Sequence, residues 1–315
     1  LYGFAEKAIA IADREQSLQE TVASFLLDVA LSIQDDRNDF VPSDSSLLSL
    51  FAEVSHLKGN WASAVNYNRR AAAAWTYKGD RKFSDDEHHA YALGQFEKFL
   101  QREVKYAKGN LTHDKKNALD DLGNLKAALA GAYTYGRGST VLHADGKYEE
   151  INQSGEVLTG FWEVNSKGVY SLKVTRENER AVNSGVVEYQ AVSLKNGLLL
   201  GLNEDDRIYF VTSKIEYLFP SIVLDTEFVT GRWQTADNRG TRVFTMRLER
   251  GAVGALDGFQ YEGFQETIKW HLVGDTIVWK RDYNGSLATQ RILRATDTYL
   301  EFLDVAHRRK HTVKR

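Results

Sequence analysis

The spacing of apolar residues changes near residue 140, and this change limits the folds that the chain can adopt. Before it, alanine is frequent and apolar residues recur every three or four positions, as at Ala8, Ile11 and Ala12, which places them on one face of a helix. After it, glycine is frequent and short runs alternate between apolar and polar residues, which is typical of strands. We therefore predict an α+β, multidomain chain in which an antiparallel α-helical domain precedes antiparallel β-barrel or meander modules.

Length and turn residues suggest where the domains begin and end. At about 150 residues per domain, 315 residues, of which 43% are hydrophobic, are enough for two or more buried cores. Turn residues at 136–139 end the helical pattern. We predict a helical domain at 1–137, a first β module at 140–224 and a second β module at 225–315.

One stretch of the helical part has the pattern of a helical repeat. Its residues are Leu48, Phe51 and Ala52, then the turn Lys58-Gly59-Asn60-Trp61, then Ala64, Tyr67 and Ala71. The pattern resembles a tetratricopeptide (TPR) repeat, in which such a turn joins two helices and small residues let them cross closely. The turns at 78–80 and 108–110 echo it with irregular spacing. The resemblance implies a degenerate TPR-like domain that binds a protein partner.

Seven alternating runs predict strands in the second part of the chain. They cover residues 169–174, 186–192, 207–212, 243–247, 276–280, 288–293 and 299–303. Asn196-Gly197 and Asn284-Gly285 are the dipeptides that tight hairpin turns prefer. Strands at this spacing without helices between them indicate antiparallel meanders that close into a barrel or sandwich.

A Gly-x-Trp segment occurs twice and indicates an internal duplication. Leu158-Thr159-Gly160-Phe161-Trp162-Glu163 is matched by Val229-Thr230-Gly231-Arg232-Trp233-Gln234. A glycine-containing polar turn and a strand-like run follow each copy. Two arrangements remain open, namely two small barrels or one larger shared sheet. We favour two modules because each copy has its own opening tryptophan.

The Gly-x-Trp opening followed by a meander resembles the calycin superfamily, which includes lipocalins, fatty-acid-binding proteins and avidin-like barrels. The resemblance covers roughly residues 155–315, and residues 270–303 are similar to the closing hairpins of short bacterial lipocalin-like domains. In that superfamily the tryptophan closes one end of the barrel beneath the ligand cavity, which implies this position for Trp162 and Trp233. The cysteines that are usual in the family are absent.

Six residues are the candidates for contact with a ligand. They are Trp162, Trp233, Trp270, His271, Arg291 and Arg294. Strand alternation places His271 opposite Trp270, so His271 points either into a barrel or, as we favour, to the surface. Either arginine could hold a carboxylate inside a barrel, although a surface position is commoner. The tryptophans alternatively serve as core anchors, and no residue is assigned as catalytic.

The densest group of metal-capable side chains is Asp85-Asp86-Glu87-His88-His89. Asp85 and the two histidines would share one side of a helix. We favour another interpretation, in which the acids complement the helix dipole and Ser84 with Glu87 forms a capping box. The sequence therefore predicts no metal and no cofactor.

Composition and missing motifs exclude several classes of function. The absence of cysteine excludes disulfides and thiol chemistry and slightly favours an exported or periplasmic protein. No nucleotide-binding, metalloprotease or serine-hydrolase motif is present. A net charge of −3 and the lack of a recognisable binding motif argue against nucleic acid. We expect no signal peptide, because no basic start is followed by an apolar core and a small-residue cleavage site. We expect no membrane span, because the apolar run at 22–33 is short and interrupted.

These observations favour a non-enzymatic binding or scaffold protein. The helical domain would engage a protein partner, and the β modules would bind a small apolar ligand or cap the assembly. One alternative is an enzyme whose site lies in a calycin-type barrel. Another is a purely structural or assembly factor whose barrels are filled by side chains.

Overall fold

The computed structural model describes residues 45–79, 83–107, 116–136, 138–178, 180–237, 240–246, 257–261, 264–281, 287–304 and 309–315. The chain divides into two compact units. One contains the residues up to Ala128 with Val164–Tyr170 and Glu188–Ser213, and the other contains Leu129–Glu163, Ser171–Val187 and Lys214–Arg315. The helices predicted before residue 45 and the turns at 108–110 and 284–285 lie outside the described residues.

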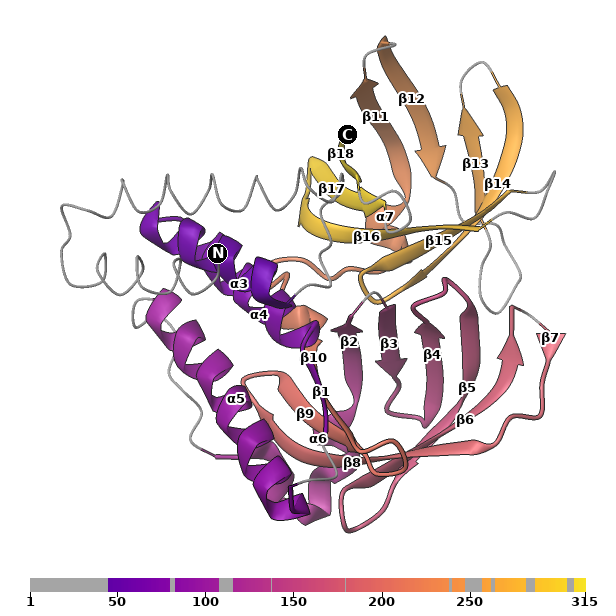
Figure 1. Ribbon diagram of the computed structural model, residues 1–315. Helices are drawn as coiled ribbons and strands as arrows, with labels where there is room; N and C mark the ends of the chain where they lie inside the picture. Colours follow the sequence, from indigo (N-terminus) through magenta and orange to yellow (C-terminus); the bar gives the residue numbers. More distant parts are fainter. Residues whose placement is uncertain are drawn as a thin grey trace. The chain divides into compact units, whose positions relative to one another are not determined.

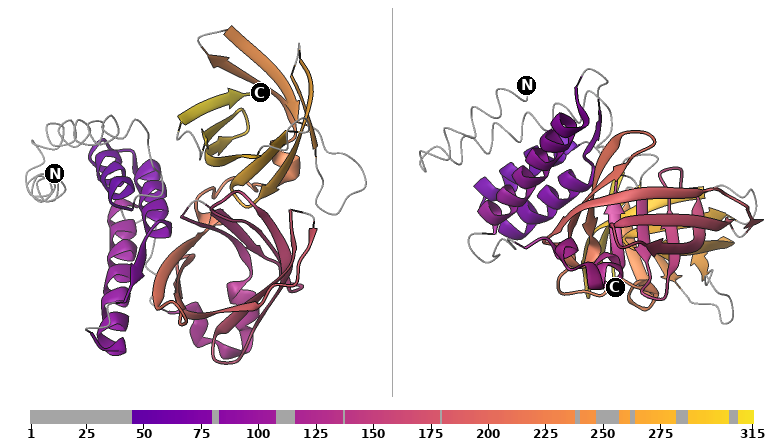
Figure 2. Two further views of the ribbon diagram at one scale, coloured as in Figure 1. Left: turned by 45° about the vertical axis from the view of Figure 1, so that its right-hand side comes forward. Right: turned by 90° about the horizontal axis from the view of Figure 1, so that it is seen from below.

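Three helices form the described helical part, and Figures 1 and 2 show α3, α4 and α5 side by side. Their bounds are α3 Ser45–Leu57, α4 Trp61–Ala73 and α5 Asp85–Tyr106. The predicted turn joins α3 to α4, with Gly59 at φ 72° in the region that favours glycine. Asn60 caps α4 by accepting a hydrogen bond from the backbone N–H of Ser63 at 3.2 Å. The helical hairpin predicted from this turn is confirmed.

Small residues let the helices approach closely. Ala52 of α3 and Ala64 of α4 are fully buried in one cluster with Tyr106 of α5. Buried charge accompanies them, because Arg69 of α4 forms an ion pair with Glu103 of α5. The helical packing follows from the alanine spacing in the sequence, whereas likeness to a TPR domain stays a prediction.

The first β region is a ten-stranded sheet that makes a half-barrel. Its order is β1-β10-β2-β3-β4-β5-β6-β8-β9, with β7 paired to β6 and a further pairing between β9 and β10. The bounds are β1 Thr76–Lys78, β2 Gly131–Tyr135, β3 Gly138–Leu142, β4 Lys147–Ile151, β5 Val157–Val164, β6 Val169–Glu177, β7 Arg180–Ala181, β8 Val186–Lys195, β9 Leu198–Asn203 and β10 Ile208–Lys214.

Two strands lie where the sequence pattern predicted helix. They are β1 at Thr76–Lys78 and β2 at Gly131–Tyr135. Gly131 has φ 145°, which no helix accommodates, and the aromatic residues Tyr133 and Tyr135 share one face of the strand. The helical interpretation of these two segments is therefore wrong, because alanine and leucine just before β2 extended the helical pattern too far.

The second β region is a closed eight-stranded antiparallel barrel (Figure 1). Its strands are β11 Gly231–Asp237, β12 Gly240–Met246, β13 Asp257–Tyr261, β14 Phe264–Val273, β15 Thr276–Arg281, β16 Leu287–Thr296, β17 Tyr299–Asp304 and β18 Arg309–Lys314. Pairing of β11 with β18 closes it. The predicted antiparallel barrel is confirmed, and the two β regions form separate sheets.

The interior of the closed barrel contains large apolar side chains. Trp233 and Trp270 are fully buried there, in one cluster with Ile277, Ile292, Leu300, Phe302 and Val313. Ile215, Leu218 and Phe219 join the same cluster from the segment before the barrel. Among the described residues, this part of the interior is therefore a packed core.

Short helices and one tight turn complete the described structure. The helices are η2 Ala118–Asp120, η3 Leu122–Asn124, α6 Leu125–Leu129, η4 Ile215–Tyr217 and α7 Thr226–Val229. Asn196 and Gly197 have φ 47° and 73° between β8 and β9, as a type I′ hairpin requires. In the part of the chain that the structure describes, no helix is long and apolar enough to span a membrane.

Candidate functional site

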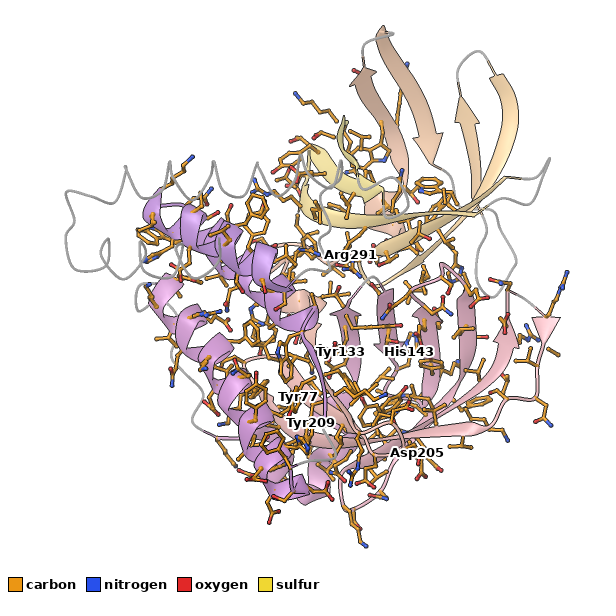
Figure 3. The ribbon with its side chains drawn as sticks, viewed as in Figure 1. Tyr77, Tyr133, His143, Asp205, Tyr209 and Arg291 are labelled. Atoms are coloured by element: carbon orange, nitrogen blue, oxygen red, sulfur yellow. The ribbon has the colours of Figure 1, made fainter. Side chains whose placement is uncertain are left out.

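Five aromatic side chains gather where α5 meets β1 and β10, all within one unit of the chain. We call this set the aromatic surface, and it consists of Tyr77, Phe83, His89, Tyr91 and Tyr209. Figure 3 shows Tyr77 and Tyr209 near one another beside α5. Soluble proteins seldom expose grouped aromatic residues unless the group has a binding role.

Tyr77 lies at the centre of the aromatic surface. Its ring centroid is 4.7 Å from that of Tyr91 and 6.4 Å from that of Tyr209. Tyr91 lies at the edge of the group and is accessible to solvent, with 49% of its surface exposed, whereas Tyr209 is buried. The surface therefore has a fixed inner ring pair and an exposed outer ring.

A buried histidine holds Tyr77 in place. The Tyr77 hydroxyl and Nδ1 of His88 are 2.7 Å apart, and Gly79 packs so closely that a Cβ there would lie 3.2 Å from the His88 ring. Phe83 meets His88 edge to face at 5.9 Å between ring centroids and is itself 54% exposed. His88 is thus a positioning residue inside this cluster.

The predicted capping box orients the α5 end of the surface. Ser84 accepts a hydrogen bond from the Glu87 N–H, and the Glu87 carboxylate accepts one from the Ser84 N–H at 2.8 Å. The Ser84 backbone N–H and hydroxyl both donate to the Glu87 carboxylate and lower its pKa. The capping box is confirmed, and it sets the direction in which α5 presents Tyr91.

Acidic side chains surround the aromatic surface. Asp85 of α5 forms an ion pair with Arg207 in the β9–β10 turn, at 2.8 Å between Nη2 and Oδ1. Burial raises the pKa of the Tyr209 hydroxyl, and the charges of Asp85 and Glu204 raise it further. Negative charge on α5 and in the β9–β10 turn therefore reaches the Tyr209 hydroxyl.

The arrangement at the start of α5 differs from a metal site. Asp85 faces Arg207, and His88 is turned toward Tyr77. Within the described ranges, no group of three or more His, Asp or Glu side chains is placed to hold a metal ion. The aromatic contacts explain why His88 lies on the buried side of the helix.

The three predicted tryptophans occupy core positions. Trp233 and Trp270 meet in the barrel core, whereas Trp162 is buried in β5 of the other sheet. The indole N–H of Trp162 donates to the His143 carbonyl, and that of Trp233 donates to the Val229 carbonyl, both at 2.8 Å. The structure therefore brings together two of the three.

The predicted histidine and arginines lie on strands of the barrel. His271 of β14 is half-buried and lies on the face opposite Trp270, as alternation predicted. Arg291 of β16 is buried and donates to the carbonyls of Gly136 at 2.5 Å and Gly138 at 2.8 Å. Arg294 is half-buried, in register with Glu301. Ligand binding by these residues stays a prediction.

A second polar cluster, which the sequence analysis missed, lies in the first sheet. The hydroxyls of Tyr135 and Tyr148 donate to the two carboxyl oxygens of Glu150. Burial raises the pKa of Glu150 to about 7, although the Tyr135 hydrogen bond opposes the rise. Near neutral pH this carboxyl can both accept and release a proton. The local signal for it is Tyr148 two positions before Glu150, which places both side chains on one face of β4.

The residues of the aromatic surface were also missed, because they come from positions far apart in the sequence. Neither a family model nor a curated protein matches the chain. The site is therefore interpreted from its own geometry and charge.

Proposed function

We propose that the protein is a non-enzymatic binding or scaffold protein that engages a protein partner through its helical part. The observation that carries this proposal is the exposure of Phe83 and Tyr91 beside the ordered ring of Tyr77. Rigid aromatic side chains lose little conformational entropy on binding and supply large contact areas. The TPR-like pattern of α3 and α4 supports the same assignment.

The β regions would then serve the assembly, and we propose a calycin-like, duplicated origin for them. The closed barrel contains a buried core around Trp233 and Trp270. Such a core favours a capping role for this barrel over binding of an apolar ligand in the same space. A small apolar ligand remains part of the proposal for the half-barrel, where Trp162 is buried.

A second candidate function is acid–base catalysis on the half-barrel. Glu150 has a pKa of about 7 and contacts two tyrosine hydroxyls, which is the titration range that a general base needs. Incubation of the protein with a panel of ester, amide and glycoside substrates tests this function. Turnover that Glu150→Gln abolishes would favour an enzyme over a scaffold.

Site-specific photocrosslinking tests the proposed binding function. A photoreactive phenylalanine analogue replaces Tyr91 in the full chain, expressed in its native cells, and adducts are identified by mass spectrometry. Tyr217 is the matched control, since 40% of its surface is exposed and it belongs to the other unit. We expect a discrete protein adduct at position 91 and none at 217. The absence of an adduct at 91, or equal adducts at both positions, would overturn the proposal.

A further inference from the structure

We propose that the aromatic surface receives a basic segment of the partner, with a lysine or arginine side chain placed over Tyr91 and its cation paired with the acidic residues around the rings. This inference rests on the proposed binding function and adds the chemistry of the partner.

The ring geometry suits a cation with an aliphatic stem. Tyr91 is tilted by 49° against Tyr77 at 4.7 Å between centroids, so the two rings present adjoining faces at an angle. Cations bind over aromatic faces within about 6 Å of the centroid. Phe83 adds exposed apolar area next to them, which the stem of a lysine or arginine can cover.

Charge on the surrounding segments favours the same partner. Residues 77–91 and 203–209, which carry the aromatic surface, contain seven acidic and four basic residues. One of the four, Arg207, is already paired with Asp85. A partner with complementary charge would be attracted to this surface and an acidic one repelled.

Three carboxylates are left to meet the incoming cation. Asp86, Glu204 and Asp205 are exposed, and within the described residues none of their side-chain carboxylates accepts a hydrogen bond or forms an ion pair. The acidic groups next to them are already engaged, since Glu87 bonds to Ser84 and Asp206 to Asn203. The free carboxylates therefore come from both α5 and the β9–β10 turn.

Selection of peptides by the full-length protein tests the partner's chemistry. Random twelve-residue peptides displayed on phage are selected on the wild type after depletion on a Phe83→Ala/Tyr91→Ala variant. We expect lysine and arginine to be enriched in the selected peptides. A selection without charge preference, or one enriched in acidic residues, would overturn the inference.

Variants then separate the roles of rings and charges for one selected peptide, measured by fluorescence anisotropy. We expect Tyr91→Ala to raise Kd about tenfold, and Asp86→Asn/Asp205→Asn to raise it about threefold. The acidic variant should also weaken the salt dependence. Tyr217→Ala and Asp120→Asn/Asp121→Asn, which alter exposed residues outside the aromatic surface, should leave Kd unchanged.

The photocrosslinking experiment and the peptide experiments distinguish failure of the binding function from failure of the inference. A crosslink at position 91 together with peptides that carry no basic preference leaves the binding function standing and removes the inference. Basic peptides whose Kd is unaffected by Tyr91→Ala indicate diffuse attraction to acidic groups and also remove it. Loss of both the crosslink and peptide selection removes the binding function itself.

Discussion

The hydroxyl of Ser139 in β3 donates a 2.5 Å hydrogen bond to the carboxylate of Asp275, in the turn between β14 and β15. Both side chains are fully buried, and the Thr276 hydroxyl lies 2.6 Å from that of Ser139. Arg291 adds a buried positive charge, with its Nε 3.8 Å from Asp275 Oδ1. This network connects the β2–β3 hairpin to the barrel strands within one unit of the chain.

Removal of the Asp275 charge tests the network. Asp275→Asn leaves the buried guanidinium of Arg291 without its anion, and breaking a buried ion pair costs about 3 kcal/mol. We expect that loss in the free energy of unfolding, measured by urea denaturation. Asp297→Asn, in an exposed turn, is the control and should change little. A change below about 0.5 kcal/mol for Asp275→Asn would show that the network adds no stability.

Replacement of Arg291 by lysine tests its planar geometry. The guanidinium donates to the carbonyls of Gly136 and Gly138 at once, which a lysine ammonium cannot reproduce with the same fork. We expect Arg291→Lys to lower the free energy of unfolding by about 2 kcal/mol. Arg294→Lys, on the same strand but half-buried, should have a smaller effect. Equal effects of the two substitutions would contradict a special role for Arg291.

Glu150 should make stability depend on pH. Its pKa is raised from 4.5 to about 7 in the folded protein, so between these values the folded state holds a proton that the unfolded state has lost. The contribution of Glu150 to the free energy of unfolding is therefore fully present below about pH 4.5. It falls as the pH rises to about 7, by about 3 kcal/mol in total.

The neutral variant Glu150→Gln removes this titration, so its unfolding free energy should change less between pH 5 and pH 8. Glu149→Gln is the matched control, because Glu149 precedes Glu150 on β4 but lies on the opposite face, near His143. Chemical denaturation across the pH range measures both variants. Identical pH profiles for wild type and Glu150→Gln would refute the assignment.

Two glycines should respond in opposite directions to alanine. At Gly160, the glycine of the first Gly-x-Trp segment, a Cβ would lie 1.9 Å from the Lys173 carbonyl oxygen, so backbone must move. We expect Gly160→Ala to destabilise by about 3 kcal/mol. At Gly94 in α5 a Cβ meets nothing within 4 Å, and Gly94→Ala should stabilise by up to about 1 kcal/mol. Thermal unfolding measures the stability of both variants. Destabilisation by Gly94→Ala would contradict the finding that the space around Gly94 is open.

Local patterns in the sequence predicted a large part of the fold. The turn before Trp61, the capping box at Ser84 and the hairpin at Asn196 are each specified by neighbouring residues, and each is present. Strand alternation also placed His271 on the face opposite Trp270. These features depend on backbone preferences within a few residues, so they can be predicted from the local sequence.

The candidate site could not be predicted in the same way. Tyr77 meets Tyr209 only because β1 pairs with β10, and it meets Tyr91 only because α5 packs beside that strand pair. The buried position of Arg291 likewise depends on the Gly136 and Gly138 carbonyls, which lie far from it in the chain. The spacing of neighbouring residues in the sequence therefore predicts neither the ring contacts of Tyr77 nor the carbonyls that Arg291 binds.

The sequence by itself therefore determined the α+β class, the helical hairpin and the antiparallel strands that close the barrel, because periodicity and turn chemistry are local properties. The fold alone determined which side chains became neighbours. It buried Arg291 and Asp275, placed Glu150 between two tyrosines and gathered the aromatic surface. These environments arise from long-range strand pairing and packing, and they set the charge, the exposure and the pKa values of these side chains.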